Sequence, residues 1–282
     1  MASPTLPAPV ATAAARLRSG RGGLLVMALV VGLGAGLGAV AFRWLIVHAT
    51  RIFSGSNDFS AAAVSSHPGN HWVPWLGGFF VVLAPVAGGL LYGPLVDRFA
   101  REAKGHGVPE VMYAVAQRGG RIQGRVAVVK ALASALCIGS GGSVGREGPI
   151  VQIGSALGSW LGRTFRVPET RLRTLVACGA AGGIAATFNA PVAGVFFALE
   201  LLLRDFAAEA FGVVVLAAVV ASVVGRAFFG DTPFLHLPAF TIAHPGEYLL
   251  YALLGLLAGV VGVLFTRVLY AVEDVCDWVW RG

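Results

Sequence analysis

The stretch Gly139–Pro149 holds the residues whose types and spacing indicate the most specific chemistry. It reads GSGGSVGREGP and runs straight into the apolar segment IVQIGSALG, which predicts a glycine-rich loop followed by a helix. Free N–H groups at a helix N-terminus, which carry about half a positive charge, can replace the water around a small anion. An ionised Glu147 would compete with such an anion for the same donors, and protonation would release it.

A nucleotide-binding loop is the alternative interpretation, because glycine-rich turns before helices also hold phosphates. The sequence lacks the GxxxxGK[ST] pattern and has a glutamate where a phosphate would rest. These features disfavour a nucleotide site.

Two further segments show the same order of a loop and then a helix. Gly105–Glu110 reads GHGVPE and predicts a second helix N-terminus, which can converge with the first on one ion. Phe188–Pro191 reads FNAP and restarts a helix that contains Glu200. Each string alone is also an ordinary helix-capping sequence.

The composition indicates which elements must position these loops. Hydrophobic residues make up 56% and charged residues 12% of the 282 positions, which is more apolar surface than a soluble core absorbs. The chain is therefore predicted to be an all-α, polytopic transmembrane protein. Four stretches approach the roughly 20 apolar residues that a spanning helix needs: Gly23–Phe42, Trp72–Val96, Phe211–Phe229 and Tyr248–Thr266. A cleaved secretory signal is the alternative for the first, although that stretch is longer than a usual signal core.

Between the second and third spans, the apolar pieces are short and interrupted by glycine and proline. They are Val108–Ala116, Val126–Ile138, Pro149–Leu161, Leu175–Phe188 and Pro191–Leu203. Short helices leave unpaired backbone groups at membrane depth, which is tolerated where they are buried in protein or line a polar cavity. We therefore expect re-entrant and half-length helices here. The small-residue run Gly179–Gly183 is typical of close helix packing alone.

Charged residues within this apolar sequence are costly and are candidates for function. They are Glu110, Lys130, Arg146, Glu147 and Glu200, although Lys130 and Arg146 fit buried ion pairs equally well. The net charge of +7 is spread between the apolar stretches, which does not indicate a nucleic-acid partner. Arginines precede the first span and follow the second, so we expect a cytoplasmic N-terminus and a location in the cell membrane.

The remaining features predict a simple domain organisation. Residues 1–22 read as a disordered cytoplasmic tail and residues 23–282 as one transmembrane domain. The three cysteines and six histidines show no disulfide, metal or cofactor spacing. No set of nucleophile and base indicates an enzyme.

Three stretches together resemble the signature segments of the CLC family of chloride channels and proton-coupled chloride exchangers: GHGVPE, GSGGSVGREGP with VQIG, and ATFNAPVAGVFFALE. The resemblance implies the first half of an inverted-repeat membrane domain, a transported chloride or other small anion, and a homodimer in a lipid bilayer. It also implies that Glu147 is the gating glutamate. The anion-binding residues that it implies are Gly105, His106, Gly107, Val108, Pro109, Gly145, Arg146, Gly148, Pro149 and Ile150.

Three departures from the family pattern keep alternatives open. His106 stands where a serine is commonest, so selectivity for chloride over nitrate or fluoride stays open, as does an inward or outward imidazole. Leu201 stands where many exchangers carry a second acid, which favours a channel, although Glu110 and Glu200 with water form a candidate proton pathway. The GxFxP loop and the tyrosine of the second half are not found, so we expect a truncated chain without that half or paired CBS domains.

Three functional hypotheses follow from these residues. The first is a gated chloride channel of the voltage-gated type, with Glu147 as the gate. The second is a proton-coupled chloride exchanger. The third is a non-conducting fragment that pairs with other subunits through apolar helix faces.

Overall fold

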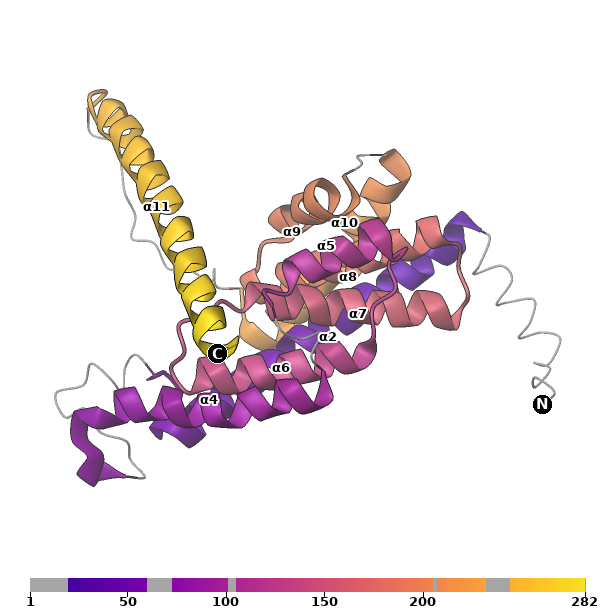
Figure 1. Ribbon diagram of the computed structural model, residues 1–282. Helices are drawn as coiled ribbons and strands as arrows, with labels where there is room; N and C mark the ends of the chain where they lie inside the picture. The colour runs from indigo at the N-terminus through magenta and orange to yellow at the C-terminus, as the bar shows by residue number, and fades with distance from the viewer. Residues whose placement is uncertain (1–19, 60–72, 101–104, 205–206, 232–243, 282) are drawn as a thin grey trace, which may run out of the picture. The chain divides into compact units, whose positions relative to one another are not determined.

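The computed structural model describes residues 20–59, 73–100, 105–204, 207–231 and 244–281 (Figure 1). Within these ranges the chain forms helices and no strand. Its contacts divide it into two units, Met1–Phe234 and Leu235–Gly282. The first unit contains α2 to α10, the second contains α11, and each is described by itself.

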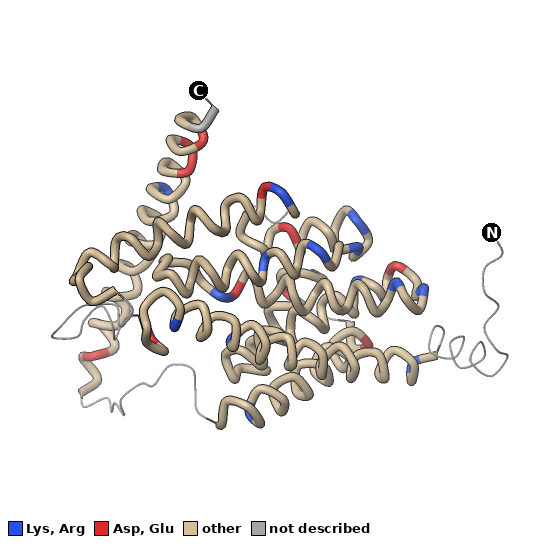
Figure 2. The backbone as a smooth tube through the Cα atoms, turned by 90° about the horizontal axis from the view of Figure 1, so that it is seen from below, with Lys and Arg blue, Asp and Glu red and all other residues tan. Residues whose placement is uncertain are grey.

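Four apolar helices are long enough to cross a membrane: Arg21–Ser54, Pro74–Phe99, Ala208–Phe229 and Glu247–Val279. They correspond to α2 (Arg21–Ser54), the 3-10 turn η1 (Pro74–Phe79) with α4 (Phe80–Phe99), α10 (Ala208–Phe229) and α11 (Glu247–Arg281). All four predicted spans are confirmed, and the chain is an integral membrane protein. Charged positions lie mostly near helix ends and in connections, separated by long uncharged stretches (Figure 2).

Helix α2 continues well beyond the predicted end at Phe42. A charged residue does not interrupt backbone hydrogen bonding, and the Arg43 guanidinium lies over the Phe229 ring of α10, 4.4 Å from its centroid. The helix ends at Gly55, whose φ of 70° is the left-handed conformation that glycine adopts readily. At its other end α2 begins at Arg21, inside the predicted tail, whose residues 1–19 lie outside the described ranges.

The five short apolar pieces are confirmed as helices between the second and third spans. They are α5 (Val108–Gln117), α6 (Gly124–Gly139), α7 (Glu147–Thr164), α8 (Glu169–Phe188) and α9 (Pro191–Phe197), which continues into the π-helical turn η3 (Ala198–Leu203). Helix α8 is not half-length, because its 20 residues include polar first turns that a search for apolar residues passes over. Helix α7 likewise begins two residues before the predicted start at Pro149.

Small residues set the packing of α7 against α8. A Cβ atom built on Gly154 would collide with the carbonyl oxygen of Gly179, and one built on Gly179 would collide with that of Gly154. The two backbones therefore touch directly, which is the close packing expected for this glycine run. Farther along, Gly183 lies against Ile150, so the end of α8 faces the start of α7.

The second unit consists of the single long helix α11 in the described residues. Its residues 248–279 are exposed, and none of its most apolar window is buried. An isolated apolar helix of this kind needs lipid or another membrane helix around it.

Candidate functional site

The N-termini of α5 and α7 meet, as the two loop sequences predicted. A Cβ atom on Gly148 would collide with the backbone carbonyl oxygen of His106, and one on Gly107 would lie 2.7 Å from the carbonyl oxygen of Gly148. Gly107 has a φ of 93°, a conformation that other residues rarely adopt. The first amides of both helices, which lack intrahelical partners, are thereby brought into one region.

The loop before α5 is held by two side chains. The Glu110 carboxylate accepts a hydrogen bond of 2.6 Å from the Gly107 amide, the arrangement by which a third helical residue caps its own helix. From α6, Lys130 donates to the carbonyl oxygen of Gly105. Lys130 is only 8% exposed, so its charge is held inside the protein beside this loop. Both residues therefore act on the loop's shape, and Lys130 contacts the loop at a backbone carbonyl group, whereas the sequence suggested a buried ion pair.

The loop before α7 carries an acidic side chain in a different setting. Glu147 is the first residue of α7, it is exposed, and its carboxylate turns back against Gly145. Arg146 precedes it at the N-cap and is half-buried, and the charges of Arg43 and Glu147 act on its guanidinium. Glu147 thus lies over the loop that the sequence singled out.

The other predicted anion-binding residues fall into two groups. Some are buried against neighbouring elements, and others are exposed or half-buried and contribute mainly backbone atoms. Gly148, Pro149 and Ile150 are buried, and Ile150 is fully so against α8. His106 is exposed, and its carbonyl oxygen rather than its imidazole faces Gly148. The described loops therefore contribute mainly backbone to the region where the helices meet. Val108 is half-buried, and Pro109 is exposed.

The two candidate proton-pathway residues, Glu110 and Glu200, are far apart in the sequence and differ in exposure and in hydrogen bonding. Glu200 is exposed on η3, and Leu201 beside it is 39% exposed. Glu110 is half-buried and already serves as the cap of α5. Helix α5 and η3 do pack against each other.

Two polar features were missed from the sequence. Asn189 ends α8 with a φ of 53° and accepts a 2.8 Å hydrogen bond from Arg226, which also pairs with Asp231 at 3.2 Å. An asparagine directly after a helix is a known left-handed cap, and that signal was available. The second feature is Gln152, a 3% exposed amide on α7. A lone amide in an apolar helix was its only signal.

These observations define a polytopic α-helical membrane protein in which two glycine-rich helix N-termini meet. The chain belongs to the CLC family: the family described as "Voltage gated chloride channel" matches residues 88–281.

Curated relatives agree with this membership. A putative chloride channel protein ClcB-like of Ralstonia nicotianae is 33% identical over 245 residues, which cover 86% of this chain and 55% of the relative. The H(+)/Cl(-) exchange transporter ClcA of Cronobacter sakazakii is 34% identical over 260 residues, which cover 89% of this chain and 52% of the relative. The chain therefore spans about half the length of the curated relatives it matches.

Solved structures show the same fold. A slow cyanobacterial Cl-/H+ antiporter matches with a TM-score of 0.73 and 26% identity, covering 90% of this chain and 58% of that protein. A CLC-type fluoride/proton antiporter matches with a TM-score of 0.66 and 25% identity, covering 92% and 57%. The predicted fold class is confirmed by these likenesses.

Proposed function

We propose that this chain carries the anion site of a transporter that moves chloride or a similar small monovalent anion across a membrane. The observation that supports this function best is the meeting of the α5 and α7 N-termini at Gly107 and Gly148. Each helix N-terminus carries about half a positive charge, so two together offer about one unit without a fixed cation. Such a site can balance one monovalent anion and still release it.

In this proposal Glu147 is the gate. Its carboxylate is a tethered anion at the first position of α7, where it competes with a free anion for the same amides. Protonation removes its negative charge, so the side chain no longer competes with the anion for those amide donors. Anion occupancy and flux are therefore expected to rise as the solution is acidified.

The test uses the chain reconstituted in liposomes, with chloride efflux measured between about pH 3 and pH 7, a range that brackets the ordinary carboxyl pKa of about 4. The wild type is expected to conduct more at acid pH, and Glu147→Gln is expected to conduct with little pH dependence. An unchanged pH dependence in the variant would remove the gating role. Absence of flux in both proteins would favour the non-conducting fragment.

Passive conduction and proton-coupled exchange are the two candidate modes of transport. Leu201 cannot carry a proton, which favours a passive channel. The names of several relatives, which are H(+)/Cl(-) exchange transporters, favour exchange. A proton gradient imposed without a chloride gradient discriminates them, because only an exchanger would then drive chloride uphill.

We also propose a cell-membrane location, a cytoplasmic N-terminus and a homodimer. The arginines before α2 and after α4 support this orientation. Labelling of a Gly20→Cys variant in sealed vesicles by an impermeant reagent tests the orientation, and cross-linking in the membrane tests the dimer.

A further inference from the structure

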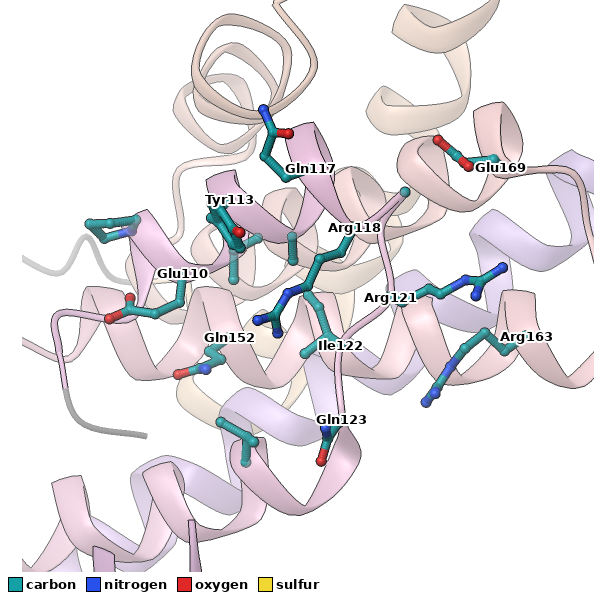
Figure 3. Close-up of a pocket in the computed structure, with 15 residues that line it drawn as sticks. Glu110, Tyr113, Gln117, Arg118, Arg121, Ile122, Gln123, Gln152, Arg163 and Glu169 are labelled. Carbon is teal, nitrogen blue, oxygen red and sulfur yellow. The ribbon is translucent and has the colours of Figure 1, made fainter. Parts of the chain in front are cut away.

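A cleft of about 1000 Å³ lies beside the paired loops, between α5, the start of α6, and α7 (Figure 3). A water molecule occupies about 30 Å³ in the liquid, and a small halide is of comparable size. The cleft is therefore far too large to be a site for one such ion. Its volume is that of a pocket for an organic molecule, which is typically about 300–1,000 Å³.

The inner wall of the cleft carries an unsatisfied acceptor. Gln152 of α7 is 3% exposed, and its Oε1 atom has no hydrogen-bond partner among the described residues. A buried polar atom without a partner destabilises the folded protein. A hydroxyl group of a ligand in the cleft would satisfy it.

Three arginines line the same cleft: Arg118, Arg121 and Arg163. In the part of the chain that the structure describes, none of them pairs with a carboxylate. Arg118 points from the end of α5 into the cleft, toward Ile122 and Gln152 (Figure 3). Its guanidinium also lies 5.3 Å from the centroid of the Tyr113 ring.

The two acidic residues of the lining are engaged elsewhere. Glu110 accepts the hydrogen bond from the Gly107 amide, and Glu169 pairs with Arg173 at 2.5 Å. The lining thus has three arginines and two carboxylates, one of which is already paired with Arg173, so the cleft keeps a net positive charge. This combination suits a phosphate, which arginine binds through several parallel hydrogen bonds.

The cleft reaches the end of the unit at which α2 begins. Glu169 lines it, and Arg171, two residues farther along α8, donates to the carbonyl oxygen of Gly20 at 3.2 Å. A spanning helix leaves the hydrocarbon at its ends, so this end lies at the level of lipid headgroups. Basic pockets between helices at this level bind anionic headgroups.

We propose that the cleft binds a phosphate ester that carries a free hydroxyl, with the phosphate on Arg118 and the hydroxyl on Gln152 Oε1. Arg121, whose side chain extends toward Arg163 (Figure 3), adds positive charge to the cleft. The headgroup of phosphatidylglycerol and free glycerol phosphate both have this chemistry. The lining extends to Pro109 and Glu110 of the first loop, but Arg118, Arg121 and Gln152, on which the proposal rests, lie outside both loops, so it does not depend on the transport function proposed above.

The test measures binding to the purified full chain in neutral detergent by calorimetry. The probes are short-chain phosphatidylglycerol, short-chain phosphatidylcholine and glycerol 3-phosphate. Phosphatidylglycerol is expected to bind at least about tenfold more tightly than phosphatidylcholine, and the double change Arg118→Gln, Arg121→Gln is expected to remove at least that factor. Gln152→Leu, which keeps the arginines, is expected to weaken the binding of phosphatidylglycerol severalfold.

The matched control is Arg98→Gln, which removes an exposed arginine at the end of α4 that does not line the cleft. It is expected to leave the affinity unchanged. Loss of affinity for both phosphatidylglycerol and glycerol 3-phosphate in the cleft variants would support a soluble ester as a ligand. Loss of affinity for phosphatidylglycerol alone would support a membrane headgroup. Equal affinity for the two lipids, or equal loss in Arg98→Gln, would overturn the proposal. Glu147→Gln is expected to bind as the wild type does, which keeps this result independent of the flux experiment.

Discussion

The two loops that meet at Gly107 and Gly148 are alike in sequence and differ in what their glutamates do. In each, glycines precede a helix whose first turn holds a proline and a glutamate. Glu110 is the third residue of α5 and bonds back to the Gly107 amide. Glu147 is the first residue of α7 and lies exposed over Gly145.

The two glutamates differ by two positions within their own helices, and this difference separates the residue that caps its helix from the candidate gate. A carboxylate at the third position reaches the N-cap amide of its own helix, so Glu110 is fixed by local geometry. A carboxylate at the first position cannot cap its own helix in this way, which fits the gating role proposed for Glu147. Lys130 adds to the contrast, because it holds the first loop by the Gly105 carbonyl group.

The largest expected effect comes from separating the two loops. In Gly148→Ala, the added Cβ atom would collide with the His106 carbonyl oxygen, a backbone atom that cannot rotate away. We expect a loss of about 2–4 kcal/mol in unfolding free energy, together with loss of stabilisation by chloride. Thermal unfolding in detergent with and without chloride measures both.

Gly259→Ala is the matched control for this change. A Cβ atom at Gly259 meets nothing within 4 Å, and alanine favours a helix over glycine. Stability is therefore expected to hold or rise. A Gly148→Ala variant as stable as this control would contradict the direct contact between the two loops.

Lys130→Met should loosen the first loop alone. Methionine fills a similar volume but cannot donate to Gly105, so the loop loses a hydrogen bond from a charged group. The expected loss is about 1–3 kcal/mol of unfolding free energy. The pH dependence of flux should persist, because Glu147 is untouched. Denaturation and flux measurements on the same preparation would separate these two effects.

Changing each glutamate to glutamine tests the comparison directly. Glutamine at position 110 keeps an acceptor for the Gly107 amide but loses the charge, so we expect about 1 kcal/mol lower stability and an unchanged pH dependence. Glu147→Gln should change stability by less than about 0.5 kcal/mol and remove most of the pH dependence. The opposite pattern in flux would make Glu110 the gate.

The sequence predicted the start of α5 and placed the start of α7 two residues late, because glycine, proline and glutamate have strong local preferences at a helix N-terminus. It did not predict which glutamate is fixed, since that depends on whether α7 begins at Pro149, as expected, or at Glu147, as found. The contact of Lys130 with Gly105 joins residues that are distant along the chain and depends on how α6 packs. Gln152 and the cleft were missed for the same reason, because burial without a partner is a tertiary property.

The smallest expected effect is that of His106→Ser. The imidazole is exposed, and the carbonyl group of this residue makes the contact with Gly148, which a serine also supplies. We therefore expect a change of less than about 0.5 kcal/mol in unfolding free energy, as for other exposed side chains. If only the backbone faces the anion, the ratio of chloride to nitrate flux should also stay nearly constant. A large change in that ratio at constant stability would show that the side chain at position 106 faces the anion, which would make the first loop a source of selectivity as well as a scaffold.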